Sequence, residues 1–127
     1  IDVYESLGRK DFHGLLNLNN TLSSRRVCYV GNSSAGIKET PALKCPSVII
    51  GNRQHGRLHS TNVLFSKVDE DDILKNIEYI FENEEFINKC KESANPYGNG
   101  TMANQSLKII ENLNLNKQLL KKVFIDI

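Results

Sequence analysis

Residues 27–36 read VCYVGNSSAG, and this stretch decides the fold. Residues 27–30 are a short apolar run of strand-forming types, which is typical of a strand buried on both faces of a sheet. The small residues at 31–36 predict a tight turn, and residues 37–44 predict a short helix whose regularity Pro41 limits. A buried strand, a turn of small residues and a helix in this order begin a β-α-β unit.

The same alternation continues toward the C-terminus. Residues 47–50, SVII, predict a second strand that Gly51 closes, and residues 63–65, VLF, predict a third. Apolar residues at helical spacing predict helices over 9–22, 71–82 and about 84–92, and a further helix that Thr101 caps. Strands that alternate with helices indicate a parallel sheet. The predicted fold class is therefore α/β, a Rossmann-like parallel sheet with flanking helices.

The length of 127 residues suits one domain. A doubly wound half-domain usually has more strands than the three predicted here. We therefore expect residues 1–127 to form a single lobe of a longer enzyme. Leu and Lys recur from Asn116 onward, which predicts a last helix or arm in a tail over about residues 114–127.

Charge and composition exclude several classes of partner. Sixteen basic and fifteen acidic residues leave a formal net charge of +1, so nothing demands nucleic acid or an anionic membrane. No apolar run approaches the roughly 18 residues that a membrane span needs. The three cysteines, Cys28, Cys45 and Cys90, lack metal-ligand spacing, so we expect reduced core thiols in the cytoplasm and neither a metal nor a cofactor.

The turn after the first strand is a candidate anion site. In an open α/β sheet, ligands bind beyond the carboxyl ends of the strands. A helix that starts there offers unpaired N–H groups, Gly and Ala permit close approach, and Ser33 and Ser34 add hydroxyl donors. These features predict a phosphate or diphosphate cradle, although it matches neither a Walker P-loop nor the dinucleotide glycine motif. The alternative is a tight turn whose serine caps the helix.

Charged residues follow the cradle and the second strand. Glu39 falls in the first helical turn after the cradle, where a carboxylate can accept two hydrogen bonds from a ribose diol. Its alternative role is pairing with the helix dipole, worth about 0.3–1 kcal/mol. Arg53 and Arg57 lie in the loop after the second strand, which returns to the same sheet edge. Arginine suits bidentate phosphate contact, and the alternative is a solvated surface charge.

Four spaced motifs together resemble one enzyme family. They are GNSSAGIKETP at 31–41, GNRQHGR at 51–57, Asn62-Val63, and NPYGNG at 95–100. In this order they closely resemble the hydrolysing UDP-N-acetylglucosamine 2-epimerases, and the resemblance covers nearly the whole chain. It implies a two-lobed, glycosyltransferase-B-like fold in which this chain is the C-terminal, nucleotide-binding lobe.

The resemblance also assigns residues to UDP. It implies that Ser33 and Ser34 hold the diphosphate, that Glu39 holds the ribose, that Arg53 approaches the phosphates, and that Phe12 lies near the uracil. The matched motifs add Gly36 to this UDP-binding set, with Asn32, Gln54 and Arg57 in support. The implied partners are a UDP-sugar substrate and an N-terminal lobe, and the complete enzyme is expected to be a homo-oligomer.

The implied reaction loses UDP by elimination across C1 and C2 of the sugar and then adds water with inversion at C2. The product is an N-acetylmannosamine-type sugar for sialic-acid-like compounds. This lobe can stabilise charge on the leaving diphosphate. No catalytic acid or base is predicted in this chain; both are expected in the other lobe.

Other titratable residues are weaker candidates. His55 and His59 are expected to be exposed loop histidines, and His13, on a helix, is weaker still. Asp69, Asp71 and Asp72 are expected to cap and solvate a helix start.

Three other functions stay open at this point. The chain could belong to a non-hydrolysing epimerase, to a glycosyltransferase of the same two-lobed fold, or to a non-catalytic nucleotide-binding module. Release of free UDP and free amino-sugar without an acceptor separates an epimerase from a transferase.

Overall fold

A computed structural model describes residues 1–22 and 26–113 of the chain. The predicted tail over residues 114–127, with its last helix or arm, lies outside the described residues. The chain divides into two compact units, Ile1–Tyr97 and a second that starts at Gly98. The predicted site residues all belong to the first unit.

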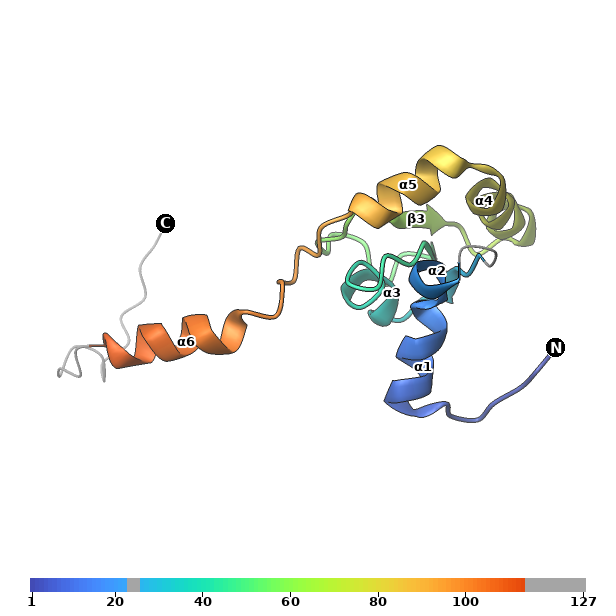
Figure 1. Cartoon of the computed structure of the whole chain (residues 1–127). Helices are drawn as coiled ribbons and strands as arrows, with labels where there is room; N and C mark the ends of the chain where they lie inside the picture. The colour runs from blue at the N-terminus through green and yellow to red at the C-terminus, as the bar shows by residue number, and fades with distance from the viewer. Residues whose placement is uncertain (23–25, 114–127) are drawn as a thin grey trace. The chain divides into compact units, whose positions relative to one another are not determined.

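Three parallel strands form the centre of the first unit (Figure 1). They are β1 (Tyr29–Gly31), β2 (Ser47–Ile50) and β3 (Val63–Ser66), in the order β1-β2-β3. Ser47 pairs with both Tyr29 and Val63, so the carboxyl ends of all three strands reach one edge of the sheet. The predicted α/β class with a Rossmann-like parallel sheet is confirmed.

Helices cover both faces of this sheet. Val48 of β2 joins a buried cluster with residues of α4 (Glu70–Glu82) and α5 (Glu84–Glu92). Its neighbour Ile49 instead packs with Ile37 of α3 (Ala35–Lys38). Successive side chains of a strand point to opposite faces, so the sheet is a middle layer with α3 on one side and α4 and α5 on the other. A strand covered on both faces has to be continuously apolar.

The predicted helix over residues 9–22 is wrong in one respect, because the chain forms two helices there. These are α1 (Gly8–Leu16) and α2 (Leu18–Thr21), which meet at Asn17. The amide of Asn20 donates to the Asn17 side chain at 2.8 Å and to the Leu43 carbonyl at 2.8 Å. Asparagine side chains that bond locally compete with a continuous helix, and this stretch is rich in them.

The first strand starts two residues later than predicted and ends one residue later. Residues 27–30 were expected, whereas β1 runs from Tyr29 to Gly31. The amide of Asn19 explains the shift: its Nδ2 donates to the Val27 carbonyl at 2.6 Å, and its Oδ1 accepts from the Val27 N–H at 2.8 Å. Both backbone groups of Val27 are therefore satisfied by a side chain rather than by a neighbouring strand.

The helix predicted over residues 37–44 is also wrong. α3 begins at Ala35 and ends at Lys38, and turns follow it. Pro41 has no N–H to continue a helix, and it disfavours helical geometry at Thr40 before it. The Thr40 hydroxyl instead donates to the Gly36 carbonyl at 2.7 Å.

The remaining elements of the first unit agree closely with prediction. β2 has the predicted bounds, β3 gains Ser66, α4 starts one residue earlier at Glu70, and α5 covers the predicted range. The Asp69 carboxylate accepts from the Asp72 N–H at 3.0 Å and caps α4, as expected.

The second unit contains α6 (Met102–Glu111). Thr101 precedes this helix, but its side chain makes no capping hydrogen bond within the described residues, so that prediction is wrong. The Thr101 hydroxyl donates to Asn99 Oδ1 at 2.6 Å and accepts from Gln105 Nε2 at 2.8 Å. These side-chain partners occupy the oxygen that a cap would have used.

The cysteines are free thiols in or beside the core. Burial raises the pKa of Cys45 to about 12 and that of Cys90 to about 11, and it also raises the pKa of Cys28. Thiols of this kind stay protonated near neutral pH and are poor nucleophiles. Their expected role in core packing is confirmed. None of the helices in the described part of the chain has the length and apolar character that a membrane crossing requires.

Candidate functional site

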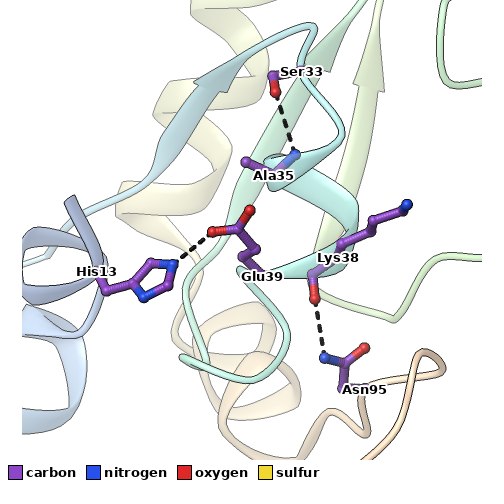
Figure 2. A network of polar contacts seen from close by, with 6 residues as sticks. All are labelled: His13, Ser33, Ala35, Lys38, Glu39 and Asn95. Carbon is purple, nitrogen blue, oxygen red and sulfur yellow. Dashed lines mark hydrogen bonds and ion pairs between the residues drawn. The ribbon is translucent and has the colours of Figure 1, made fainter. Parts of the chain in front are cut away.

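The small-residue turn lies at the carboxyl end of β1. Ser33 is exposed, and its Oγ accepts from the Ala35 N–H at 3.4 Å (Figure 2). Ser34 stands at the start of α3, where its carbonyl accepts from Ile37 and Lys38. Within the described residues, the Ser34 side chain makes no capping hydrogen bond. A cap therefore does not account for the Ser34 hydroxyl.

Gly36 faces the sheet. It is buried, and a Cβ added there would overlap the Ile49 side chain and lie 2.6 Å from Cε1 of Tyr29. Only glycine lets α3 approach the sheet this closely. The packing explains this glycine by itself, and its predicted part in UDP binding stays a prediction.

Glu39 was expected in the first turn of a short helix over residues 37–44, but it directly follows the last residue of α3. A helix of four residues has only a small dipole. Any attraction of the turn for an anion therefore depends on nearby N–H groups, hydroxyls and cations.

The loop after β2 meets the turn, as the parallel topology predicts. Gln54 is 1% exposed, and its Nε2 donates to the Asn32 carbonyl at 2.8 Å. Arg53 and Arg57 on either side of it are exposed and form no ion pair within residues 1–22 and 26–113. The buried amide thus joins the two loops while cationic side chains stay free at the same edge.

The segment before Gly98 holds the other end of α3. Asn95 Nδ2 donates to the Lys38 carbonyl at 3.0 Å, as Figure 2 shows. The Lys38 ammonium lies 5.4 Å from the centre of the Tyr97 ring, and the Tyr97 hydroxyl donates to the Leu58 carbonyl at 2.8 Å. The first part of the NPYGNG motif therefore ties α3 to the loop that follows β2.

A contact between α1 and Glu39 was not predicted from the sequence. His13 Nε2 lies 2.6 Å from Glu39 Oε2 (Figure 2), although the two residues are 26 positions apart. The two side chains are 30% and 43% exposed. No local pattern signals such a pair, because it forms only when α1 packs beside α3.

Glu39 and His13 line a surface pocket with Phe12. Its volume is about 820 Å³, and the segment before and at the start of α1 completes it: Tyr4, Glu5, Ser6, Leu7, Gly8 and Arg9. This volume falls within the range of about 300–1,000 Å³ typical of small-molecule sites. The Phe12 ring stands edge-on to Tyr29, with 6.5 Å between ring centres. The structure therefore brings together the residues predicted for uracil and ribose.

The two loop histidines pack against one aromatic ring. His55 and His59 both meet Phe65 edge-on, with ring centres 5.3 Å and 5.1 Å apart. Both residues are exposed, as expected. Across the described part of the chain, no three His, Cys, Asp or Glu side chains are arranged to hold a metal ion.

Asp72 fastens the start of α4 to the end of β3. Its Oδ2 accepts from the Ser66 hydroxyl and from the Lys67 N–H, both at 2.8 Å. Both bonds stabilise the charged carboxylate and therefore lower the pKa of Asp72. The Lys67 N–H has the larger effect and the Ser66 hydroxyl the smaller. This carboxylate serves the fold by joining β3 to α4; the expected capping role belongs to Asp69, not to Asp72.

We expect Asp72→Asn to lower the melting temperature at pH 7 and to have progressively less effect in acid. A carboxyl group whose pKa is lowered by folding stabilises the protein above its unfolded pKa of about 3.9. That contribution disappears as the pH falls through the folded pKa. Asp71→Asn is the matched control, because it also removes a carboxylate from the first turn of α4. Equal melting curves for the two variants from pH 7 to pH 3 would contradict a role for the Ser66 and Lys67 bonds.

Comparison with known proteins agrees with this architecture. The family model described as UDP-N-acetylglucosamine 2-epimerase matches residues 1–111. Polysialic acid biosynthesis protein P7 of Escherichia coli is 35% identical over 98 residues, which cover 77% of this chain and 25% of that protein. The GDP/UDP-N,N'-diacetylbacillosamine 2-epimerase (hydrolyzing) of Campylobacter jejuni is 33% identical over 127 residues, or 98% of this chain and 30% of the relative.

A third relative is the UDP-N,N'-diacetylbacillosamine 2-epimerase (hydrolyzing) of Legionella pneumophila, 33% identical over 94 residues, 73% of this chain and 23% of that protein. The chain thus spans between 23% and 30% of the length of these relatives. The parallel sheet and its flanking helices define an α/β domain of the Rossmann-like class. Within that class, the chain belongs to the UDP-N-acetylglucosamine 2-epimerase family.

Proposed function

We propose that this chain is the UDP-binding, C-terminal lobe of a two-lobed hydrolysing 2-epimerase that acts on UDP-N-acetylglucosamine or a related UDP-amino-sugar. The observation that carries the proposal is the 2.8 Å hydrogen bond from Gln54 to the Asn32 carbonyl. It joins the serine turn to the arginine loop at the carboxyl edge of the sheet, where α/β domains bind their ligands.

Each part of the nucleotide has a matching group in this proposal. The hydroxyls of Ser33 and Ser34 and the guanidinium of Arg53 hold the diphosphate, with Arg57 nearby. Glu39 accepts hydrogen bonds from the ribose diol, and Phe12 lies against the uracil in the pocket of about 820 Å³. Asn32 and Gln54 support the turn, and Gly36 keeps α3 on the sheet.

The reaction proceeds in two stages. A base removes the proton from C2 of the sugar while the bond from C1 to the diphosphate oxygen breaks, which gives UDP and a sugar with a C1–C2 double bond. Water then adds across that bond, with hydroxyl at C1 and a proton at C2 on the opposite face. Arg53 and the two serines lower the barrier of the first stage by stabilising negative charge on the departing diphosphate. The acid and the base come from the other lobe.

The proposal extends to the setting of the complete enzyme. We place it in the cytoplasm, which its free thiols support, and we propose that it supplies N-acetylmannosamine-type sugars, which the names of its relatives support. We also propose that the complete enzyme is a homo-oligomer. Release of UDP and free amino-sugar from the complete enzyme, without any acceptor, tests it against a glycosyltransferase. UDP-N-acetylglucosamine and UDP-N,N'-diacetylbacillosamine are the two substrates to compare.

Ser34→Ala is expected to weaken UDP binding with little change in stability. Among the described residues its hydroxyl makes no capping bond that folding would lose. A hydrogen bond to a charged phosphate contributes about 1.5–3 kcal/mol, or roughly ten- to a hundredfold in affinity. Isothermal titration of UDP into the chain at low salt measures the change, and circular dichroism checks the fold.

Ser60→Ala is the control for that titration. The Ser60 hydroxyl donates to the Ala94 carbonyl at 2.6 Å, and Ser60 precedes β3, at the edge opposite the turn. It should leave UDP affinity unchanged. If Ser34→Ala binds UDP as tightly as the unmodified chain, the assignment of the turn to the diphosphate is wrong.

A further inference from the structure

The carboxylate of Glu39 is held before any nucleotide is present. Its Oε2 lies 2.6 Å from His13 Nε2, at a side-chain exposure of 43% for Glu39 and 30% for His13. A glutamate side chain in water samples many rotamers, and ordering it on binding costs entropy. The contact with α1 restricts that freedom in the folded protein.

The contact leaves most of the carboxylate available. An ionised carboxylate has two oxygens and about four acceptor positions. His13 occupies one of them, on Oε2. The other oxygen and the second position on Oε2 can still accept hydrogen bonds, and two neighbouring acceptors match a cis-diol.

The surroundings of His13 suit an orienting role. The residue lies within α1, where its carbonyl accepts from the Asn17 N–H at 3.0 Å, and its ring lies 5.9 Å from the ring of Phe12. Arg9 and Glu5 also line the pocket, but within the described residues only His13 pairs with Glu39. Phe12 and His13, which are consecutive in α1, thus lie at the proposed uracil site and beside the carboxylate proposed to bind the ribose.

We propose that His13 is a positioning residue that orients Glu39 toward the ribose diol and so determines the preference for ribose over 2'-deoxyribose. This inference rests on the proposed function. The alternative is that His13 only joins α1 to the end of α3. A joining role would weaken ribose and deoxyribose nucleotides equally, whereas an orienting role changes the ratio between them.

The test compares the affinities of UDP and 2'-deoxy-UDP by titration calorimetry. The unmodified chain should prefer UDP, and Glu39→Gln, which weakens the acceptor, should reduce that preference. His13→Ala should reduce it by about five- to tenfold, the effect of roughly one hydrogen bond. His13→Gln keeps an N–H donor at similar reach and should recover a large part of the preference.

Two further variants complete the design. His59→Ala removes an exposed histidine that lies outside this pocket, and it should leave the ratio unchanged. His13→Phe keeps a ring beside Phe12 and removes the donor, so it takes the place of His13→Ala if the alanine variant unfolds.

The outcomes separate the two proposals. No binding of UDP by the folded, unmodified chain would overturn the proposed function and this inference with it. UDP binding with a normal preference for ribose, unchanged in His13→Ala or His13→Phe, would overturn the inference alone. A reduced preference that His13→Gln recovers supports the positioning role.

Discussion

Gly36→Ala is expected to lower the free energy of unfolding by about 1–3 kcal/mol, the usual cost of an overpacked core. The added methyl group would overlap the buried Ile49 side chain and lie 2.6 Å from a ring carbon of Tyr29. Ile49 is fully buried and Tyr29 is partly buried, so we expect α3 to move outward. Because α3 directly follows Ser34, UDP affinity should fall together with stability. Chemical denaturation and UDP titration on the same variant measure the two effects.

Gly14→Ala is the matched control, and it should have the opposite sign. Gly14 lies in α1, and a Cβ added there would meet no atom of residues 1–22 and 26–113 within 4 Å. Alanine in an open helical position is more stable than glycine by about 0.5–1 kcal/mol. The same chemical change is thus expected to destabilise at Gly36 and to stabilise at Gly14. Equal effects at both positions would show that the close packing of α3 on the sheet does not contribute to the free energy of unfolding.

Ile80→Ala should have a larger effect, a loss of about 2–5 kcal/mol. Ile80 is fully buried in the cluster that α4 and α5 form against Val48. Truncation removes apolar surface from the core and leaves a cavity that the sheet can fill only in part. Since a domain has about 5–15 kcal/mol of stability in total, this one change brings the protein close to unfolding at moderate temperature.

Leu74→Ala on the same helix gives the comparison. Leu74 is 48% exposed, and surface substitutions usually change stability by no more than about 0.5 kcal/mol. Urea denaturation of the two variants should therefore give clearly separated midpoints with similar slopes. Coincident midpoints would mean that α4 packs on the sheet differently from the structure described here.

Elements decided by burial were predictable from the sequence. β2 and α5 have the predicted bounds, because an uninterrupted apolar run or a clear helical spacing allowed a single solution. Elements decided by particular side-chain bonds were not. The side-chain amide of Asn19 bonds the N–H and carbonyl of Val27, so that β1 starts only at Tyr29. Pro41 and the hydrogen bond of the Thr40 hydroxyl end α3 before residue 39. These bonds depend on residues that come together only in the fold.

The candidate site divides in the same way. Parallel topology predicted that the serine turn and the arginine loop share an edge, and the Gln54 bond to Asn32 joins them there. The partner of Glu39 could not be predicted, because His13 lies 26 positions away on a helix of uncertain facing. Periodicity gives the face of a helix that is apolar, but it does not say which neighbouring residue a polar side chain meets.

The shortness of α3 has a consequence for local unfolding. A single turn is far below the roughly 12–15 residues at which an isolated helix becomes even marginally stable in water. α3 therefore exists only while Ile37 and Gly36 pack on the sheet, and it has no means of fraying independently of that packing. Its amide hydrogens should exchange with solvent through the same opening that exposes the core beneath it. The serine turn and the hydrophobic interior are therefore expected to open together. The candidate site stays ordered only while the packing of α3 on the sheet is intact.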